Sequence, residues 1–96
     1  MMKIELIENS KGGEFVIHES GNRMAEMGYT NAGEDKIIID HTFVDTAFRG
    51  ENIGRELVKA GVEFAREKNV KIIPLCPFAM AEFERNPEYA DVLVKS

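Results

Sequence analysis

The chain of 96 residues contains a single cysteine, Cys76, and no group of His and Cys residues at the spacing of metal ligands. One cysteine cannot form an internal disulfide, and the missing cluster argues against a structural zinc site. We therefore expect no bound metal and a fold that is stabilised by packing.

Long hydrophobic runs and clusters of basic residues are also missing. No apolar run approaches the roughly 20 residues of a membrane helix, and the Met-Met-Lys start lacks the apolar core of a signal peptide. These absences predict a cytoplasmic protein without a membrane partner. A net charge of -5 without a basic stripe argues against nucleic-acid binding, and it mildly favours cationic substrates such as amines.

The remaining composition is that of an ordinary soluble domain. Hydrophobic residues make up 44% of the chain and charged residues 30%. A chain of this length forms one domain, residues 1–96, with a modest core.

The first half of the sequence predicts four strands that are joined by short turns. Apolar residues that alternate or run together mark each strand, and segments rich in Asn, Ser and Gly separate them. Four consecutive strands with such connections form an antiparallel meander. The expected strands cover residues 3–8, 14–19, 24–31 and 36–44.

Beyond the fourth strand the hydrophobic period changes from 2 to 3.6, which predicts a helix over residues 52–68 that Asn69 ends. A short apolar strand over 71–75 follows, and a right-handed crossover places it parallel to the fourth strand. Two further helices are expected over 78–84 and 87–94. The fold class is therefore α+β, with a mixed, mostly antiparallel five-stranded sheet covered by helices.

The segment between the fourth strand and the long helix has the features of a phosphate site. The first amides of a helix have no partner within the helix and lie at the positive end of its dipole. Gly50 and Gly54 would let a phosphate approach the main chain closely, and Arg49 and Arg55 flank the turn with positive charge.

Arg49-x-x-Asn52-x-Gly54 resembles the Arg/Gln-x-x-Gly-x-Gly/Ala signature with which the GCN5-related N-acetyltransferases bind the pyrophosphate of coenzyme A. The segments His41-Thr-Phe-Val44 and Pro74-Leu-Cys-Pro-Phe78 are similar to those of the minimal members of that superfamily, which have about this length. The signature has glycine where this chain has Asn52. Asparagine tolerates left-handed backbone angles better than most residues.

The resemblance implies that the fourth and fifth strands diverge and that acetyl-CoA lies in the gap, with main-chain groups near Phe43 and Val44 bound to its pantetheine arm. The stretch from Arg85 to Tyr89 resembles the Lys-His-Pro-Glu-Tyr stretch of the small family, with Asn86 in place of histidine, and this puts Arg85 near coenzyme A. The residues implied to surround the pyrophosphate are Arg49, Gly50, Glu51, Asn52, Ile53, Gly54 and Arg55.

Cys76 follows the fifth strand and immediately precedes an expected helix, where the helix dipole lowers a thiol pKa and favours the thiolate. It is therefore a candidate nucleophile that accepts the acetyl group. Two alternatives remain open. Cys76 could be a small buried hydrophobic residue, or it could line a channel in which the acetyl group passes directly from acetyl-CoA to the amine.

His41 lies on the strand closest to the expected thioester. Because histidine side chains titrate near neutral pH, it is a candidate general base that deprotonates the incoming ammonium group. The alternative is a structural residue that packs on the face shared with Ile39 and Phe43.

These features predict an acetyl-CoA-dependent N-acetyltransferase that acts on a small-molecule or protein amine, with His41 and Cys76 as the chemical pair. The alternative is a non-catalytic module that binds coenzyme A or acyl-CoA, because so short a chain leaves little material for a substrate pocket. The sequence does not identify the acceptor amine. Unpaired strand edges leave both a monomer and a weak homodimer open.

Overall fold

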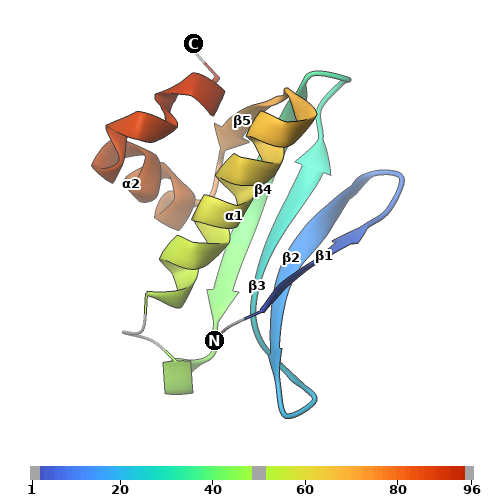
Figure 1. The fold of residues 1–96 in the computed structure, drawn as a ribbon, viewed down its shortest axis with the longest axis vertical. Coiled ribbons are helices and arrows are strands. Elements are labelled where there is room, and N and C mark those ends of the chain that lie inside the picture. The colour runs from blue at the N-terminus through green and yellow to red at the C-terminus, as the bar shows by residue number, and fades with distance from the viewer. Residues whose placement is uncertain (1–2, 49–51, 95–96) are drawn as a thin grey trace.

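Five strands form one mixed sheet whose spatial order follows the chain (Figure 1). The structure is a computed structural model that describes residues 3–48 and 52–94. Neighbours among the first four strands pair antiparallel, and the fifth pairs parallel with the fourth, which confirms the predicted meander and the predicted parallel fifth strand. The strands are β1 (Ile4–Glu8), β2 (Gly12–Glu19), β3 (Asn22–Asn31), β4 (Lys36–Val44) and β5 (Lys71–Pro74).

The long helix predicted after β4 is present, and it lies across one face of the sheet (Figure 1). It ends at Asn69, which has left-handed backbone angles (φ 60°, ψ 44°) that asparagine tolerates. No helix within the described ranges is long and apolar enough to span a membrane. The helices are α1 (Ile53–Lys68) and α2 (Pro77–Arg85), with two 3-10 helices, η1 (Thr46–Phe48) and η2 (Pro87–Val92).

The predicted last helix over 87–94 is wrong in type and length, because η2 is a 3-10 helix that ends at Val92. Leu93 instead forms a parallel bridge with Ile72 of β5, and the Val94 N–H donates a hydrogen bond of 3.0 Å to the Ile72 carbonyl oxygen. Pairing with the edge of β5 therefore competes with helix formation at this point of the chain.

The hydrophobic core lies between the sheet and the two α-helices. Met27 of β3 and Ile39 of β4 are fully buried and point at α1, since a Cβ at Gly61 would lie 2.8 Å from Met27 Cε and 3.9 Å from Ile39 Cδ1. The glycine thus lets α1 approach the sheet closely. Ala79 and Phe83 of α2 belong to the same core, so both helices cover the same face.

The opposite face of the sheet carries a network of charged side chains. Arg23 Nη1 lies 2.8 Å from Glu14 Oε2 and 3.2 Å from Glu26 Oε1. Val16 is paired with Glu26 in the sheet register and is fully buried although it lies on this face. Within the described part of the chain neither α1 nor α2 covers this face, and Val16 does not belong to the core cluster beneath the helices.

A β-bulge interrupts β4 beside its antiparallel neighbour. Tyr29 is paired with Ile39 and Gly28 with His41, so Asp40 has no residue opposite it in β3. An extra residue of this kind shifts the alternation of side chains between the two faces of the sheet. The bulge therefore decides which face His41 occupies.

Candidate functional site

Strands β4 and β5 diverge at the centre of the predicted site. Their pairing ends at Ile39 and Pro74, whereas β4 continues to Val44. The amides of Leu75 and Cys76 both donate to the Ile39 carbonyl oxygen, each at 3.2 Å, and the chain then turns into α2. The divergence that the family resemblance implies is therefore present.

The first turn of α1 begins with Asn52, which has left-handed backbone angles (φ 60°, ψ 22°). The carbonyl oxygen of Asn52 accepts the amide of Glu56 at 3.1 Å, which is the first hydrogen bond of the helix. A position with positive φ favours glycine, and asparagine is among the few other residues that adopt it readily. This explains how asparagine can stand where the signature has glycine.

The amides of Ile53, Gly54 and Arg55 precede that first helical bond and have no acceptor among the residues that the structure describes. They form the amino-terminal turn of a 16-residue helix, where the dipole favours an anion. The predicted phosphate contacts of Arg49, Gly50 and Glu51 lie outside the described residues, and those three contacts stay predictions.

Gly54 does not face open space. A Cβ at this position would lie 2.7 Å from Phe78 Cζ, well inside the roughly 3.5–4.0 Å of a carbon contact. We predicted that the missing Cβ of Gly54 lets a phosphate approach the main chain closely. In the structure the Phe78 ring of α2 occupies the space on that side of Gly54.

Arg55 and Arg85 come together around one buried carboxylate. Glu82 of α2 is only 2% exposed, and its Oε2 lies 3.1 Å from Arg85 Nη1 and 3.7 Å from Arg55 Nε. The Asn86 side-chain amide donates to Glu82 Oε1 at 3.3 Å. Both arginine side chains remain more than half exposed, so each keeps donors that are accessible to a ligand while Glu82 fixes its position.

Cys76 is the residue immediately before α2 and is 7% exposed. Its Sγ lies 3.4 Å from the Thr42 hydroxyl of β4. Burial raises the pKa of the Cys76 thiol, whereas hydrogen bonds with the Thr42 hydroxyl and the backbone amides of Ala79 and Phe78 favour the thiolate and outweigh burial, so the pKa is lowered. The surroundings of Cys76 thus lower its pKa, and its role as nucleophile, channel lining or buried hydrophobic residue stays a prediction.

His41 lies on the other face of the sheet. A Cβ at Gly28, its partner in β3, would lie 2.5 Å from His41 Cε1, so the imidazole ring covers the glycine. His41 Nε2 lies 2.8 Å from Glu26 Oε2. When the imidazole is neutral, a proton on Nε2 satisfies this bond and leaves the lone pair on Nδ1 free to accept a proton.

His41 and Cys76 therefore lie on opposite faces of β4. Thr42 is paired with Met27, which points at α1, and Cys76 contacts Thr42 from that side. The alternative that His41 shares a face with both Ile39 and Phe43 is correct only for Phe43, because the bulge at Asp40 separates His41 from Ile39. The structure therefore does not bring the two predicted residues together on one face of the sheet.

Phe43 and Val44 lie beyond the point where β5 leaves the sheet. Phe43 is 46% exposed and is paired with Glu26 on the face of His41. Val44 is paired with Ala25, packs against the core and ends β4. Their main chain thus lies beyond the last residue pair of β4 and β5, and its binding to a pantetheine arm stays a prediction.

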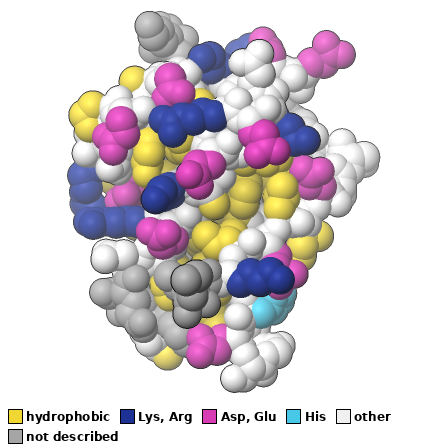
Figure 2. All heavy atoms as spheres, viewed as in Figure 1, with side chains coloured by type: hydrophobic (Ala, Val, Ile, Leu, Met, Phe, Trp, Pro, Cys, Tyr) yellow, Lys and Arg dark blue, Asp and Glu magenta, His cyan; other side chains and the backbone are white. Residues whose placement is uncertain are grey.

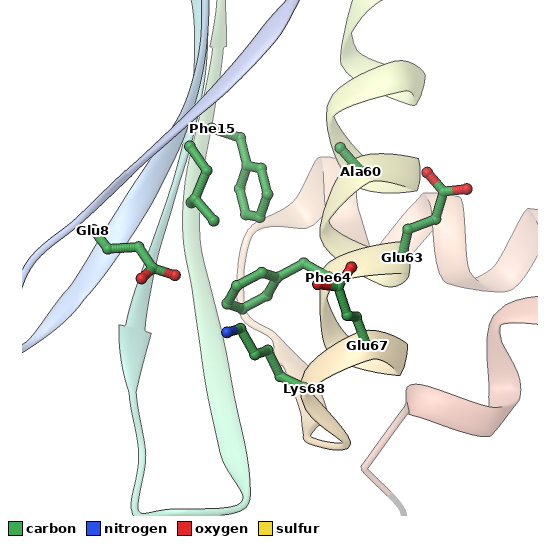
Figure 3. Close-up of a pocket in the computed structure, with 8 residues that line it drawn as sticks. Glu8, Phe15, Ala60, Glu63, Phe64, Glu67 and Lys68 are labelled. Atoms are coloured by element: carbon green, nitrogen blue, oxygen red, sulfur yellow. The ribbon is translucent and has the colours of Figure 1, made fainter.

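The structure also has a groove that lies away from this site, between β1 and the carboxyl-terminal half of α1 (Figure 3). It has a volume of about 550 Å³, and Phe15 and Phe64 point into it.

Acidic and basic side chains intermingle over the face that carries α1, with hydrophobic side chains visible between them (Figure 2). In the described ranges no group of three or more His, Cys, Asp or Glu residues could hold a metal ion.

Sequence reasoning missed three residues of the site: Thr42 beside Cys76, Glu26 beside His41, and Glu82 between the two arginines. One local signal was the position of Thr42 next to His41. Glu82 and Arg85 lie three positions apart in α2, a spacing that sequence alone could have indicated as a pair. The contacts of Glu82 with Arg55 and of Glu26 with His41 join different elements, and a single sequence does not reveal such pairs.

The sequence profile of a family described as GCN5-related N-acetyl-transferase matches residues 14–92. Protein NATD1 of Xenopus tropicalis is 28% identical over 85 residues, which cover 88% of this chain and 78% of that protein.

Two solved structures are similar to the whole fold. A GCN5-like protein from Staphylococcus aureus, whose solution structure was determined by NMR, has a TM-score of 0.75 and 36% identity, and the match covers 100% of this chain and 93% of that chain. A GNAT family acetyltransferase from Elizabethkingia anophelis, solved with acetyl-CoA bound, has a TM-score of 0.69 and 12% identity, covering 92% of this chain and 74% of that chain. At that identity the second likeness concerns the fold alone.

Proposed function

Because the chain belongs to the GCN5-related N-acetyltransferase family, we propose that it transfers an acetyl group from acetyl-CoA to a primary amine. One observation carries the proposal: the amides at the start of α1, which have no acceptor among the described residues, lie beside the start of α2, and α2 follows β5 just after β5 parts from β4. Such amides suit a diphosphate, and such a gap suits an extended chain. A protein of the same fold binds acetyl-CoA, which supports the choice of donor.

Acetyl-CoA supplies a thioester, whose acetyl group is activated for transfer. In the proposal the amides of Ile53, Gly54 and Arg55 hold its pyrophosphate, and the exposed guanidinium groups of Arg55 and Arg85 add positive charge on the side of Glu82. Main-chain groups of Phe43 and Val44 bind the pantetheine arm. Arg49, Gly50 and Glu51 complete the binding set as predicted from the sequence.

We propose Cys76 as the nucleophile. Its thiolate attacks the thioester carbonyl, a new sulfur–carbon bond forms, and the thiolate of coenzyme A leaves. The amine then attacks the acetyl carbon, the bond between that carbon and the Cys76 sulfur breaks so that Cys76 leaves as a thiolate, and the nitrogen releases its surplus proton to solvent. The lowered pKa of Cys76 and its position at the amino-terminal end of α2 support this role.

His41 is the proposed general base. Primary amines are mostly protonated near neutral pH, so a proton must leave before the amine can attack. Nδ1 of His41 is the nitrogen available for that proton, since Nε2 is bonded to Glu26. The base would act from the uncovered face of the sheet, and the thiolate from the face of the helices.

The proposal is tested in two steps. Acetyl-CoA should raise the melting temperature of the protein, and incubation with radiolabelled acetyl-CoA should label polyamines or Lys-containing peptides. A mass gain of one acetyl group on the intact protein, absent in Cys76→Ala, would identify the covalent route, whereas full activity of Cys76→Ala would exclude it. Binding without transfer would indicate a coenzyme A binding module, and no thermal shift would refute the proposal.

A further inference from the structure

Gly54 in the first turn of α1 faces the tip of the Phe78 ring in α2. A Cβ at Gly54 would lie 2.7 Å from Phe78 Cζ, 2.9 Å from Cε2 and 3.4 Å from Cε1. Because Cζ and its two neighbours are the nearest atoms, the outer edge of the Phe78 ring points toward Gly54. No side chain fits at residue 54 while the ring stays in place.

Space is the reason for glycine at this position. Gly54 is buried in a regular helix and does not have the positive φ that favours glycine elsewhere. In a helix interior glycine is less favourable than alanine by about 1 kcal/mol. The glycine therefore reduces the helix propensity of α1. In return it allows the Phe78 ring to pack against the first turn of α1.

Phe78 also lies beside the thiol. It is the second residue of α2, two positions after Cys76, and its backbone amide is one of the groups that favour the Cys76 thiolate. The side chain and the main chain of Phe78 thus connect the start of α1 with Cys76. With 38% of its surface exposed, the ring is not simply a core residue.

We propose that Phe78 is a positioning residue that docks the start of α2 on the first turn of α1 and thereby sets Cys76 relative to the amides of Ile53 and Gly54. This inference rests on the proposed function, in which those amides hold the pyrophosphate and Cys76 receives the acetyl group. It assigns Gly54 a role in docking the two helices. If Gly54 served only to let a phosphate approach, the effect of Gly54→Ala on stability would not depend on Phe78.

A double-mutant cycle distinguishes the two roles. Gly54→Ala should lower the melting temperature of the parent protein, because the new methyl group displaces the ring. In the Phe78→Ala background the same change should raise the melting temperature, because alanine favours the helix and meets no ring. Gly61→Ala is the matched control on the same helix. Its new methyl group would contact Met27 Cε and Ile39 Cδ1, and neither atom belongs to Phe78, so the effect of Gly61→Ala should be the same in both backgrounds.

The second measurement is the pH dependence of Cys76 alkylation by iodoacetamide, in the absence of coenzyme A. The midpoint should rise by about one pH unit in Gly54→Ala and in Phe78→Ala, and should stay unchanged in Gly61→Ala. Phe78→Leu replaces Phe78→Ala in both measurements if the alanine variant does not fold.

A Gly54→Ala effect of the same sign and size in both backgrounds, or alkylation midpoints that do not move, would overturn the inference. Failure of the parent protein to bind acetyl-CoA in calorimetry would refute the proposed function instead. The two failures are distinguishable, because the cycle and the alkylation series are measured without coenzyme A.

Discussion

The contact between Glu26 and His41 gives a prediction that can be worked out from the structure. Glu26 Oε2 lies 2.8 Å from His41 Nε2, and its other oxygen lies 3.2 Å from Arg23 Nη1. Glu26→Gln keeps the size of the side chain and one acceptor oxygen but removes the charge. We expect it to weaken both contacts without creating a cavity.

The size of the effect follows from exposure. A hydrogen bond to a charged group contributes about 1.5–3 kcal/mol to stability when it is buried. His41 is 52% exposed and Glu26 is 22% exposed, so solvent screens their interaction, and exposed ion pairs contribute about 0.2–1 kcal/mol. Glu26→Gln should therefore lower the free energy of unfolding at pH 7 by about 1 kcal/mol or less.

The sign of the pH dependence follows from the pKa of Glu26. The hydrogen bond with His41 is the largest cause that lowers it from the ordinary value of 4.5, with Arg23 adding to the effect against partial burial. A carboxyl group with a lowered pKa stabilises the fold above pH 4.5, and this stabilisation is lost as the pH falls through the lowered pKa. The parent and Glu26→Gln should therefore become equally stable in acid.

Urea unfolding at pH 7 and at a series of lower pH values measures this difference. Glu14→Gln is the control, because Glu14 bonds to Arg23 at 2.8 Å on the same face but does not contact His41. If His41 is the general base, Glu26→Gln should also reduce the rate of acetyl transfer by about tenfold, and Glu14→Gln should not. Equal rates in the two variants, or a stability difference that persists in acid, would refute the reasoning.

Three further predictions follow from other contacts. Cys76→Ser should fold, because it replaces the thiol with a slightly smaller hydroxyl, but it should lose the acetyl adduct in intact-mass spectrometry; an adduct that survives in Cys76→Ala as well would point to another residue. Glu82→Gln should lower the free energy of unfolding by about 1–2 kcal/mol in urea, since a buried carboxylate loses its charge-assisted bonds; an unchanged midpoint would contradict the role given to it. Met27→Ala should lower the free energy of unfolding in urea by about 2–5 kcal/mol, because Met27 is fully buried beneath Gly61. A decrease below about 1 kcal/mol would show that the core closes around the cavity.

The elements of the fold could be predicted from the sequence because local patterns specify them. The β-branched run at Ile37–Ile39 predicted β4, whose observed bounds, Lys36–Val44, match the prediction. The change of period predicted α1 to within one residue at its start, and Asn69 marked its end. Each of these signals lies within a few residues of the structure that it specifies.

The arrangement of the site could not be predicted in the same way. The bulge at Asp40 depends on how β3 pairs with β4, and it moves His41 to the face opposite Cys76. Phe78 lies 24 positions after Gly54, and nothing in the intervening sequence announces their contact. Glu82 is a charged residue on a helix, which a pattern of polarity would place in solvent. The family signature predicted which segments meet, but the side-chain partners follow from tertiary packing.

The bridge between Leu93 and Ile72 has a consequence for how copies of this protein could associate. It covers part of the outer side of β5, so another chain could extend the sheet there only by displacing the carboxyl-terminal segment. The other edge strand of the sheet is β1. Its Glu-Leu-Ile-Glu stretch begins with Glu5 and ends with Glu8. Two such strands laid side by side would bring like charges together, so intermolecular β-pairing is opposed by obstruction on one side and by repulsion on the other.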